Sequence, residues 1–134
     1  MRVFLVEDDA VFAAEIGSYL ARQGIPVVPL QNLVDLESAL CQDHAAEDDI
    51  IVLDLGLGKE NGMHFLLTHC NKYQTPCIVL TGNDNVTDRV LALELGADDY
   101  IVKTTPPREI LARLHAVGRR VTQKRDRLPN ASPD

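Results

Sequence analysis

This sequence has no tryptophan, and its aromatic residues amount to 4 % of 134 positions. It has three cysteines, Cys41, Cys70 and Cys77, which form no CxxC pair and leave one thiol over in any disulfide scheme. Such sparse cysteine usage favours a reducing compartment, in which thiols pack as small apolar groups. We therefore expect a cytoplasmic protein without a disulfide framework.

Long hydrophobic runs are also missing. No apolar stretch approaches the roughly 18 residues of a membrane span, and residues 1–6 are too short and too soon followed by acids for a signal peptide. The remaining composition is ordinary, with 46 % hydrophobic and 25 % charged residues. These values exclude collagen-like and wholly disordered chains. We expect one globular domain that has no membrane partner.

The charge is unevenly distributed along the chain. Residues 1–118 carry 18 acids and 8 bases, net −10, whereas residues 119–134 carry 5 bases and 2 acids, net +3. An acidic body repels nucleic-acid phosphates, so any contact with DNA has to come from elsewhere. The apolar pattern stops at Val121, which predicts a domain over 1–121 and a polar, basic linker or tail over 122–134. A basic nucleic-acid-binding arm is the alternative for the tail.

Short apolar runs alternate with segments of helical spacing. The predicted strands are 3–6, 25–30, 50–53, 77–80 and 100–102, and the predicted helices lie within 12–20, 33–40, 63–70, 86–95 and 110–117. Gly24 and Gly96 are typical ends for the first and fourth helices, while Pro26 and Pro29 place the second strand at a sheet edge. Successive strand–helix units predict an α/β fold, a five-stranded parallel sheet with helices on both faces.

Polar residues follow four of these strands. They are Glu7, Asp8 and Asp9 after the first, Asp54 after the third, Thr81 and Gly82 at the end of the fourth, and Lys103 after the fifth. Ligands of open parallel sheets bind beyond the carboxyl ends of the strands. Carboxylates that converge there need a cation, and Mg²⁺ beside a phosphate suits their oxygen atoms. Taken singly, these residues have simpler roles as helix caps, turn hydroxyls or solvated surface charges.

Four stretches resemble the motifs of the receiver domains of two-component response regulators. They are residues 4–9 (FLVEDD), 51–57 (IVLDLGL) followed by Asn61-Gly62, 79–82 (VLTG) and 96–103 (GADDYIVK). The resemblance covers residues 1 to about 121. It implies a flavodoxin-like, doubly wound (βα)5 fold with strand order 2-1-3-4-5. It also implies a protein that accepts a phosphoryl group from a sensor histidine kinase and is not an enzyme, beyond slow autodephosphorylation at most.

The resemblance assigns a role to each residue of the strand ends. Asp54 is the implied phosphoacceptor, and the implied Mg²⁺ ligands are Glu7 (through water), Asp8, Asp54 and the backbone carbonyl of Gly56. The phosphoryl oxygens are expected to contact Thr81, the amide of Gly82, and Lys103. Thr81 and Tyr100 are the implied switch residues, which would remodel the face formed by helix 86–95, strand 100–102 and the last helix.

Charged residues on that face resemble the set through which OmpR/PhoB-like regulators dimerise when phosphorylated: Arg89, Glu94, Asp98, Asp99, Glu109 and Arg113. The analogy pairs Arg89 with Glu109 and Asp99 with Arg113 across a two-fold axis, although ordinary solvated helix charge is the simpler interpretation. The implied output is transcription regulation through a DNA-binding domain that this sequence lacks. A single-domain phosphorelay protein is the alternative.

Two loops depart from the family pattern. Thr104 follows Lys103 where most receivers carry proline, so we expect a trans peptide bond there, because a cis bond without proline costs about 3–4 kcal/mol. We also expect the loop over 103–106 to be displaced or mobile, which would weaken the contact of Lys103 with the site. Gly58 stands where proline is common, which implies a looser loop after Asp54.

Four other interpretations are weighed against a phosphorylated receiver. An FMN site is disfavoured because acids, rather than a Ser/Thr/Gly loop, follow the first strand. An aspartyl phosphohydrolase is disfavoured because Gly56 occupies the place of its second carboxylate. The third alternative is a receiver that is regulated without phosphorylation. A metal–thiolate site is disfavoured because His64, His69 and Cys70 do not share one helix face.

Overall fold

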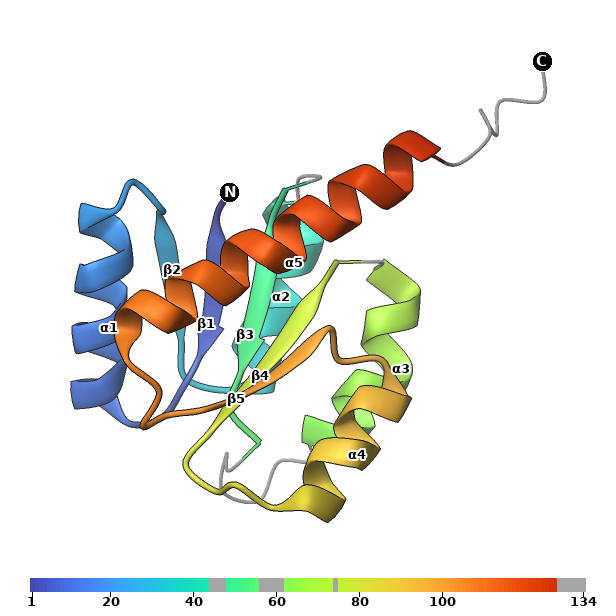
Figure 1. Cartoon of the computed structure of the whole chain (residues 1–134), viewed down its shortest axis with the longest axis horizontal. Coiled ribbons are helices and arrows are strands. Elements are labelled where there is room, and N and C mark those ends of the chain that lie inside the picture. The colour runs from blue at the N-terminus through green and yellow to red at the C-terminus, as the bar shows by residue number, and fades with distance from the viewer. Residues whose placement is uncertain (44–47, 56–61, 74, 128–134) are drawn as a thin grey trace.

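The computed structural model describes residues 1–43, 48–55, 62–73 and 75–127, in which strands and helices alternate (Figure 1). The strands are β1 (Val3–Val6), β2 (Val27–Leu30), β3 (Ile50–Leu53), β4 (Cys77–Thr81) and β5 (Asp99–Val102). The helices are α1 (Ala10–Arg22), α2 (Leu33–Asp43), α3 (Gly62–Tyr73), α4 (Val86–Leu95) and α5 (Pro107–Arg127). The strands pair in parallel in the order 2-1-3-4-5, which confirms the predicted fold class.

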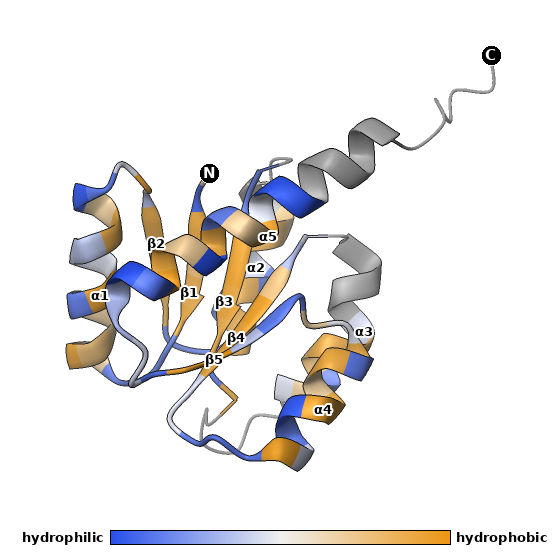
Figure 2. Cartoon of the chain, in the orientation of Figure 1, coloured by the Kyte–Doolittle hydropathy of each residue, from blue (hydrophilic) through white to orange (hydrophobic). Residues whose placement is uncertain are grey.

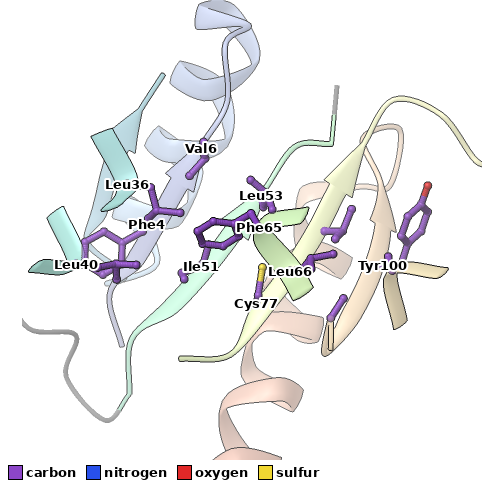
Figure 3. Packing of buried hydrophobic residues seen from close by; sticks show 13 residues of the cluster. Phe4, Val6, Leu36, Leu40, Ile51, Leu53, Phe65, Leu66, Cys77 and Tyr100 are labelled. Atoms are coloured by element: carbon purple, nitrogen blue, oxygen red, sulfur yellow. The ribbon is translucent and has the colours of Figure 1, made fainter. Parts of the chain in front are cut away.

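The sheet is covered on both faces, with α1 and α5 on one side and α2, α3 and α4 on the other (Figure 1). The central strands are apolar at successive positions, so each of them supplies side chains to both layers (Figure 2). Phe4 and Ile51 pack with Phe65 and Leu66 of α3 in one layer (Figure 3). In the other layer, strand residues pack against Ile16 and Leu20 of α1 and against Ile110, Leu114 and Val117 of α5.

The second strand lies at the sheet edge, as Pro29 predicts, but it is shorter than expected. Its pairing with β1 begins at Val27. Ile25 instead lies in the turn that follows α1, because its amide donates to the carbonyl of Leu20 at 2.9 Å. Gly24 makes this turn with φ of 85°, and Gly96 ends α4 with φ of 124°. Both glycines therefore end their helices as predicted, in backbone conformations that disfavour a side chain.

The last helix is longer at both ends than the apolar spacing predicts. Pro107 opens it, a position that proline tolerates because a first-turn amide has no partner in the helix. It continues past Val121 to Arg127 through glutamine, lysine and arginine, which favour a helix even where no apolar stripe faces a core. The beginning of the polar tail is thus helical, and α5 extends past the sheet (Figure 1). None of the described helices is long and apolar enough to span a bilayer.

Candidate functional site

Strand register brings the predicted site residues to one rim of the sheet. Glu7 and Asp54 follow Val6 and Leu53, which are partners in adjacent strands, and the Asp54 amide donates to the Val6 carbonyl at 3.1 Å. Thr81 lies at the end of β4, where its carbonyl accepts from the Lys103 amide at 2.7 Å. Four strands therefore place an acid, a hydroxyl or a lysine on the same edge.

Glu7, Asp8 and Asp54 form an acidic cluster in this rim. Each offers a carboxylate oxygen, and these oxygens all lie within 4.8 Å of one another. Glu7 and Asp54 are buried, with 3 % and 5 % of their surfaces exposed, whereas Asp8 is exposed. Such a set of oxygen donors fits a hard divalent cation that keeps some of its water, as Mg²⁺ does. The fourth predicted ligand, the carbonyl of Gly56, lies outside the described residues.

Lys103 reaches into the same cluster. Its Nζ donates to Oδ2 of Asp54 at 3.0 Å and also contacts Oε1 of Glu7. The peptide after Lys103 is trans, as predicted. The expected weakening of the Lys103 contact is wrong, because this side chain reaches Asp54. In the loop, Thr105 donates to the Val102 carbonyl at 2.9 Å in a turn that follows β5 directly. The Lys103 ammonium thus reaches the pocket without a proline at the next position.

The charges in the pocket perturb one another. Burial raises the pKa of Glu7, and the hydrogen bond from Lys103 offsets this rise only in part. Burial alone would lower the pKa of Lys103, but hydrogen bonds to Glu7 and Asp54 outweigh it and raise that pKa. Lys103 is therefore a permanent cation at neutral pH. A single ammonium shared by two buried carboxylates leaves excess negative charge that a divalent cation would neutralise.

The start of α1 separates the roles of the two neighbouring aspartates. Asp9 is the N-cap, with Oδ1 accepting from the amides of Val11 and Phe12 at 3.1 Å each. The Asp9 amide in turn donates to Oε2 of Glu7 at 3.1 Å. Capping by Asp9 leaves the carboxylate of Asp8 for the acidic cluster.

The two predicted switch residues both bond the backbone of Asn83 in the β4–α4 loop. Thr81 Oγ1 accepts from the Asn83 amide at 3.3 Å, and the Tyr100 hydroxyl donates to the Asn83 carbonyl at 3.0 Å. Tyr100 is buried at the edge of a core cluster (Figure 3), and its pKa is raised by burial and by Asp88 and Asp84. The sequence analysis missed Asn83; the signal available was a hydroxyl residue two positions before it, as in an ST-turn.

Gly82, whose amide is predicted to contact a phosphoryl oxygen, lies beside open space. Among the residues that the structure describes, no heavy atom other than those of its chain neighbours comes within 4 Å of where its Cβ would be. A small anion therefore has room at this end of β4.

The predicted dimer face makes ion pairs within the single chain. Arg113 Nη1 lies 3.2 Å and 3.3 Å from the two carboxylate oxygens of Asp99, and Arg113 Nη2 lies 3.1 Å from Glu109. Burial alone would lower the pKa of Arg113, but Asp99 and Glu109 outweigh it and raise that pKa. Arg89 lies 3.4 Å from Asp84. Of the two pairs expected between copies, Asp99–Arg113 is thus a contact within one chain, whereas Arg89 contacts Asp84 and Glu109 contacts Arg113.

On this face, Asp98 has a role within the fold, and Arg120 is an additional charged residue. Asp98 Oδ2 accepts from the Cys77 amide at 2.9 Å, so this carboxylate supports the start of β4. Arg120 donates from Nη2 to the Asp98 carbonyl at 3.4 Å and was missed by the sequence analysis. Its spacing of seven from Arg113, two helical turns, was the available signal. Glu94 is exposed on α4.

The fold and the site define a doubly wound α/β domain with an acidic cluster, a lysine and a hydroxyl at the carboxyl ends of its strands. The family model for the response regulator receiver domain matches residues 3–115, so the chain belongs to that family. It is a receiver domain of two-component response regulators, and its homologues are OmpR/PhoB-type regulators.

Curated relatives are transcriptional regulators about twice as long. The chain is 40 % identical over 124 residues to the response regulator protein PmrA of Pseudomonas aeruginosa, covering 91 % of this chain and 54 % of the relative. It is 37 % identical over 121 residues to the transcriptional regulatory protein GltR of the same species, covering 88 % and 49 %. The chain therefore spans about half the length of these relatives.

Solved receiver domains share the fold. The BeF3-activated N-terminal receiver domain of Klebsiella pneumoniae RstA aligns with a TM-score of 0.81 and 33 % identity, covering 89 % of this chain and 99 % of that one. A CheY-like receiver domain from Methanospirillum hungatei has the same TM-score at 20 % identity, over 92 % and 97 % of the two chains, and shows likeness of fold alone.

Proposed function

We propose that Asp54 accepts a phosphoryl group from the phosphohistidine of a sensor kinase in the cytoplasm, and that Mg²⁺ assists. The observation that carries this proposal is the position of the buried Asp54 carboxylate, which lies 3.0 Å from Lys103 and in a cluster with Glu7 and Asp8. In the transfer, the N–P bond of the donor breaks, an O–P bond to Asp54 forms, and the donor nitrogen keeps the electron pair. The domain is a phosphoacceptor and not a turnover enzyme.

The residues around Asp54 supply what phosphoryl transfer needs. Glu7, Asp8 and Asp54 would hold the cation, which when bound offsets negative charge on the incoming phosphoryl group. Lys103 would move from the Asp54 carboxylate to a phosphoryl oxygen, since both are within its reach. Thr81 and the amide of Gly82 would donate to the remaining oxygens. Positioning and electrostatics are then sufficient, with no further covalent chemistry by the protein.

The output is proposed to pass through Tyr100 and Asn83. A phosphoryl oxygen that accepts from the Thr81 hydroxyl would draw this hydroxyl away from the Asn83 amide, and the Tyr100 hydroxyl donates to the carbonyl of the same residue. This loop leads into α4, so the face of α4, β5 and α5 would change and favour a homodimer. The dimer would then position a DNA-binding output domain for transcription regulation, as the curated names and greater lengths of the relatives suggest.

The test is the intact mass of the protein after treatment with acetyl phosphate, with and without Mg²⁺. We expect one acid-labile phosphoryl group on the wild type in the presence of Mg²⁺ and none on Asp54→Asn. The matched control is Asp9→Asn, which keeps a good N-cap and should be phosphorylated normally. Phosphorylation of Asp54→Asn to the wild-type extent, or an unmodified wild type with Mg²⁺, would refute the proposal.

A further inference from the structure

An aromatic ring of α1 lies against the cation of the pocket. The Nζ atom of Lys103 is 5.1 Å from the ring centroid of Phe12. This distance is within the roughly 6 Å over which an ammonium is attracted by the face of an aromatic ring. Phe12 is half-buried, and it packs at the edge of the core cluster between the sheet, α1 and α5. The ring is thus held by the core and touches the ammonium at the pocket.

The position of Phe12 is tied to the same acidic site. Its amide donates to Oδ1 of Asp9 at 3.1 Å, and the Asp9 amide donates to Oε2 of Glu7 at 3.1 Å. Glu7 also contacts the Lys103 ammonium through its other oxygen. Two hydrogen bonds and one ion pair therefore connect the ring, the cap and the lysine. This closed set of contacts places the ring relative to the pocket without help from the loop after β5.

The lysine itself has a long, flexible stem and no proline directly after it. Thr104 follows Lys103, and their peptide is trans. A lysine side chain loses several rotatable degrees of freedom when its ammonium is held in one place. A fixed ring beside the ammonium reduces the number of stem conformers that compete with the productive one. The ring also offers the ammonium a favourable contact that does not involve the carboxylates of the pocket.

We propose that Phe12 is a positioning residue that holds Lys103 over the acceptor site by a cation–π contact. The inference rests on the proposed phosphoacceptor function. Phe12 touches neither Mg²⁺ ligand atoms nor the transferred group; it acts through Lys103. The ligand whose binding depends on it is therefore the phosphoryl group or a mimic of it, and not the metal.

The first test measures the affinity of the full chain for fluoroberyllate in Mg²⁺, with Phe12→Leu and Phe12→Tyr variants. We expect Phe12→Leu to bind about three- to tenfold more weakly, as the loss of one cation–π contact predicts, and Phe12→Tyr to stay within about twofold of wild type. The matched control is Tyr19→Leu, an aromatic-to-leucine change on α1 that packs against the same core cluster. It should leave the affinity within about twofold, and Mg²⁺ binding should be unchanged in all variants.

A second measurement reports the contact directly by NMR. The side-chain methylene protons of Lys103, assigned with a Lys103→Arg variant, should show an upfield ring-current shift in the wild type. This shift should be lost in Phe12→Leu and kept in Phe12→Tyr and Tyr19→Leu. Wild-type fluoroberyllate affinity in Phe12→Leu, an equal loss in Phe12→Tyr or Tyr19→Leu, or a parallel loss of Mg²⁺ affinity would overturn the inference. Failure of the wild type to bind fluoroberyllate would instead refute the proposed function.

Discussion

Glu7 is a buried carboxylate that shares the ammonium of Lys103 with Asp54. Its contact with Lys103 does not offset the loss of hydration, so its pKa is raised. A carboxyl group whose pKa is higher in the folded than in the unfolded chain stabilises folding in its protonated form. That contribution is present below the ordinary pKa of 4.5 and is lost as the pH rises through the folded value. The acidic pocket therefore weakens the metal-free fold at neutral pH.

We predict that Glu7→Gln raises the melting temperature of the metal-free protein at pH 8 by roughly 2–5 °C, because a neutral amide removes the buried charge. The gain should shrink as the pH falls toward 4.5, where Glu7 of the wild type becomes protonated as well. Thermal unfolding monitored by circular dichroism over this pH range measures the difference. Glu15→Gln, at an exposed acid of α1, is the control for net charge. Equal gains in the two variants at pH 8 would contradict the prediction.

Among the elements, α4 ends in a turn that only glycine adopts without strain. Gly96 has φ of 124°, and its amide donates to the Leu93 carbonyl at 3.3 Å. The next amide, of Ala97, donates to Ala92 at 3.0 Å, so the turn satisfies the last carbonyls of the helix. This geometry leads the chain directly into β5, which carries Tyr100 and precedes Lys103. The end of α4 thus contributes to where the switch residue lies.

We predict that Gly96→Ala destabilises the domain by about 1–2 kcal/mol, since a Cβ is disfavoured at this φ. Urea unfolding monitored by circular dichroism measures the loss. Gly82→Ala is the matched control, because a Cβ there meets open space and its backbone lies outside the left-handed region. That control should change the stability by less than about 0.5 kcal/mol. Similar losses in both variants would show that the backbone conformation of Gly96 is not the cause.

The elements themselves could be predicted well from the sequence. The buried strands are continuous apolar runs, and the helices between them carry apolar residues at helical spacing. The exceptions have local causes that composition does not show. Ile25 is apolar and β-branched, yet its amide completes the turn that ends α1. The residues after Val121 lack an apolar stripe, yet their helix propensity and the absence of a breaker extend α5 to Arg127.

The residues that form the site could be predicted from the sequence, whereas the contacts between them could be predicted less well. The strand ends supplied Glu7, Asp54, Thr81 and Lys103, because the carboxyl ends of parallel strands meet at one edge. The link between Thr81 and Tyr100 through Asn83 depends on the path of a loop, which no periodicity describes. The contact of Phe12 with Lys103 likewise depends on how α1 packs on the sheet.

At the scale of the whole molecule, four charges of the α4, β5 and α5 face already have partners within one chain: Arg89, Asp99, Glu109 and Arg113. Arg113 bonds both Asp99 and Glu109. Dimerisation on this face would exchange or share these pairs rather than create new ones. Exposed pairs of this kind contribute only about 0–1 kcal/mol each, so they would determine the geometry of a dimer more than its strength. The exposed apolar side chains of α4, Val90 and Leu93, would supply apolar area to the same interface.

We predict that fluoroberyllate and Mg²⁺ shift the wild type from monomer to dimer, and that Arg113→Ala weakens the dimer about two- to fivefold. Sedimentation equilibrium gives the dissociation constants. Arg108→Ala is the matched control, since Arg108 is exposed on α5 but lies about 140° around the helix from Arg113. If the dimers of Arg113→Ala and Arg108→Ala have equal dissociation constants, this face is excluded as the interface.

The sequence by itself determined the order of strands and helices and which chemical groups end each strand, because side-chain periodicity and apolar runs are local properties of the chain. Tertiary structure alone decided that the carboxylate of Asp8 joins those of Glu7 and Asp54 in one cluster. It also decided that the Lys103 ammonium reaches Asp54, 49 residues away, despite the missing proline. The physical reason is that these contacts depend on strand register and helix packing, which bring distant residues together with a precision that local sequence does not encode.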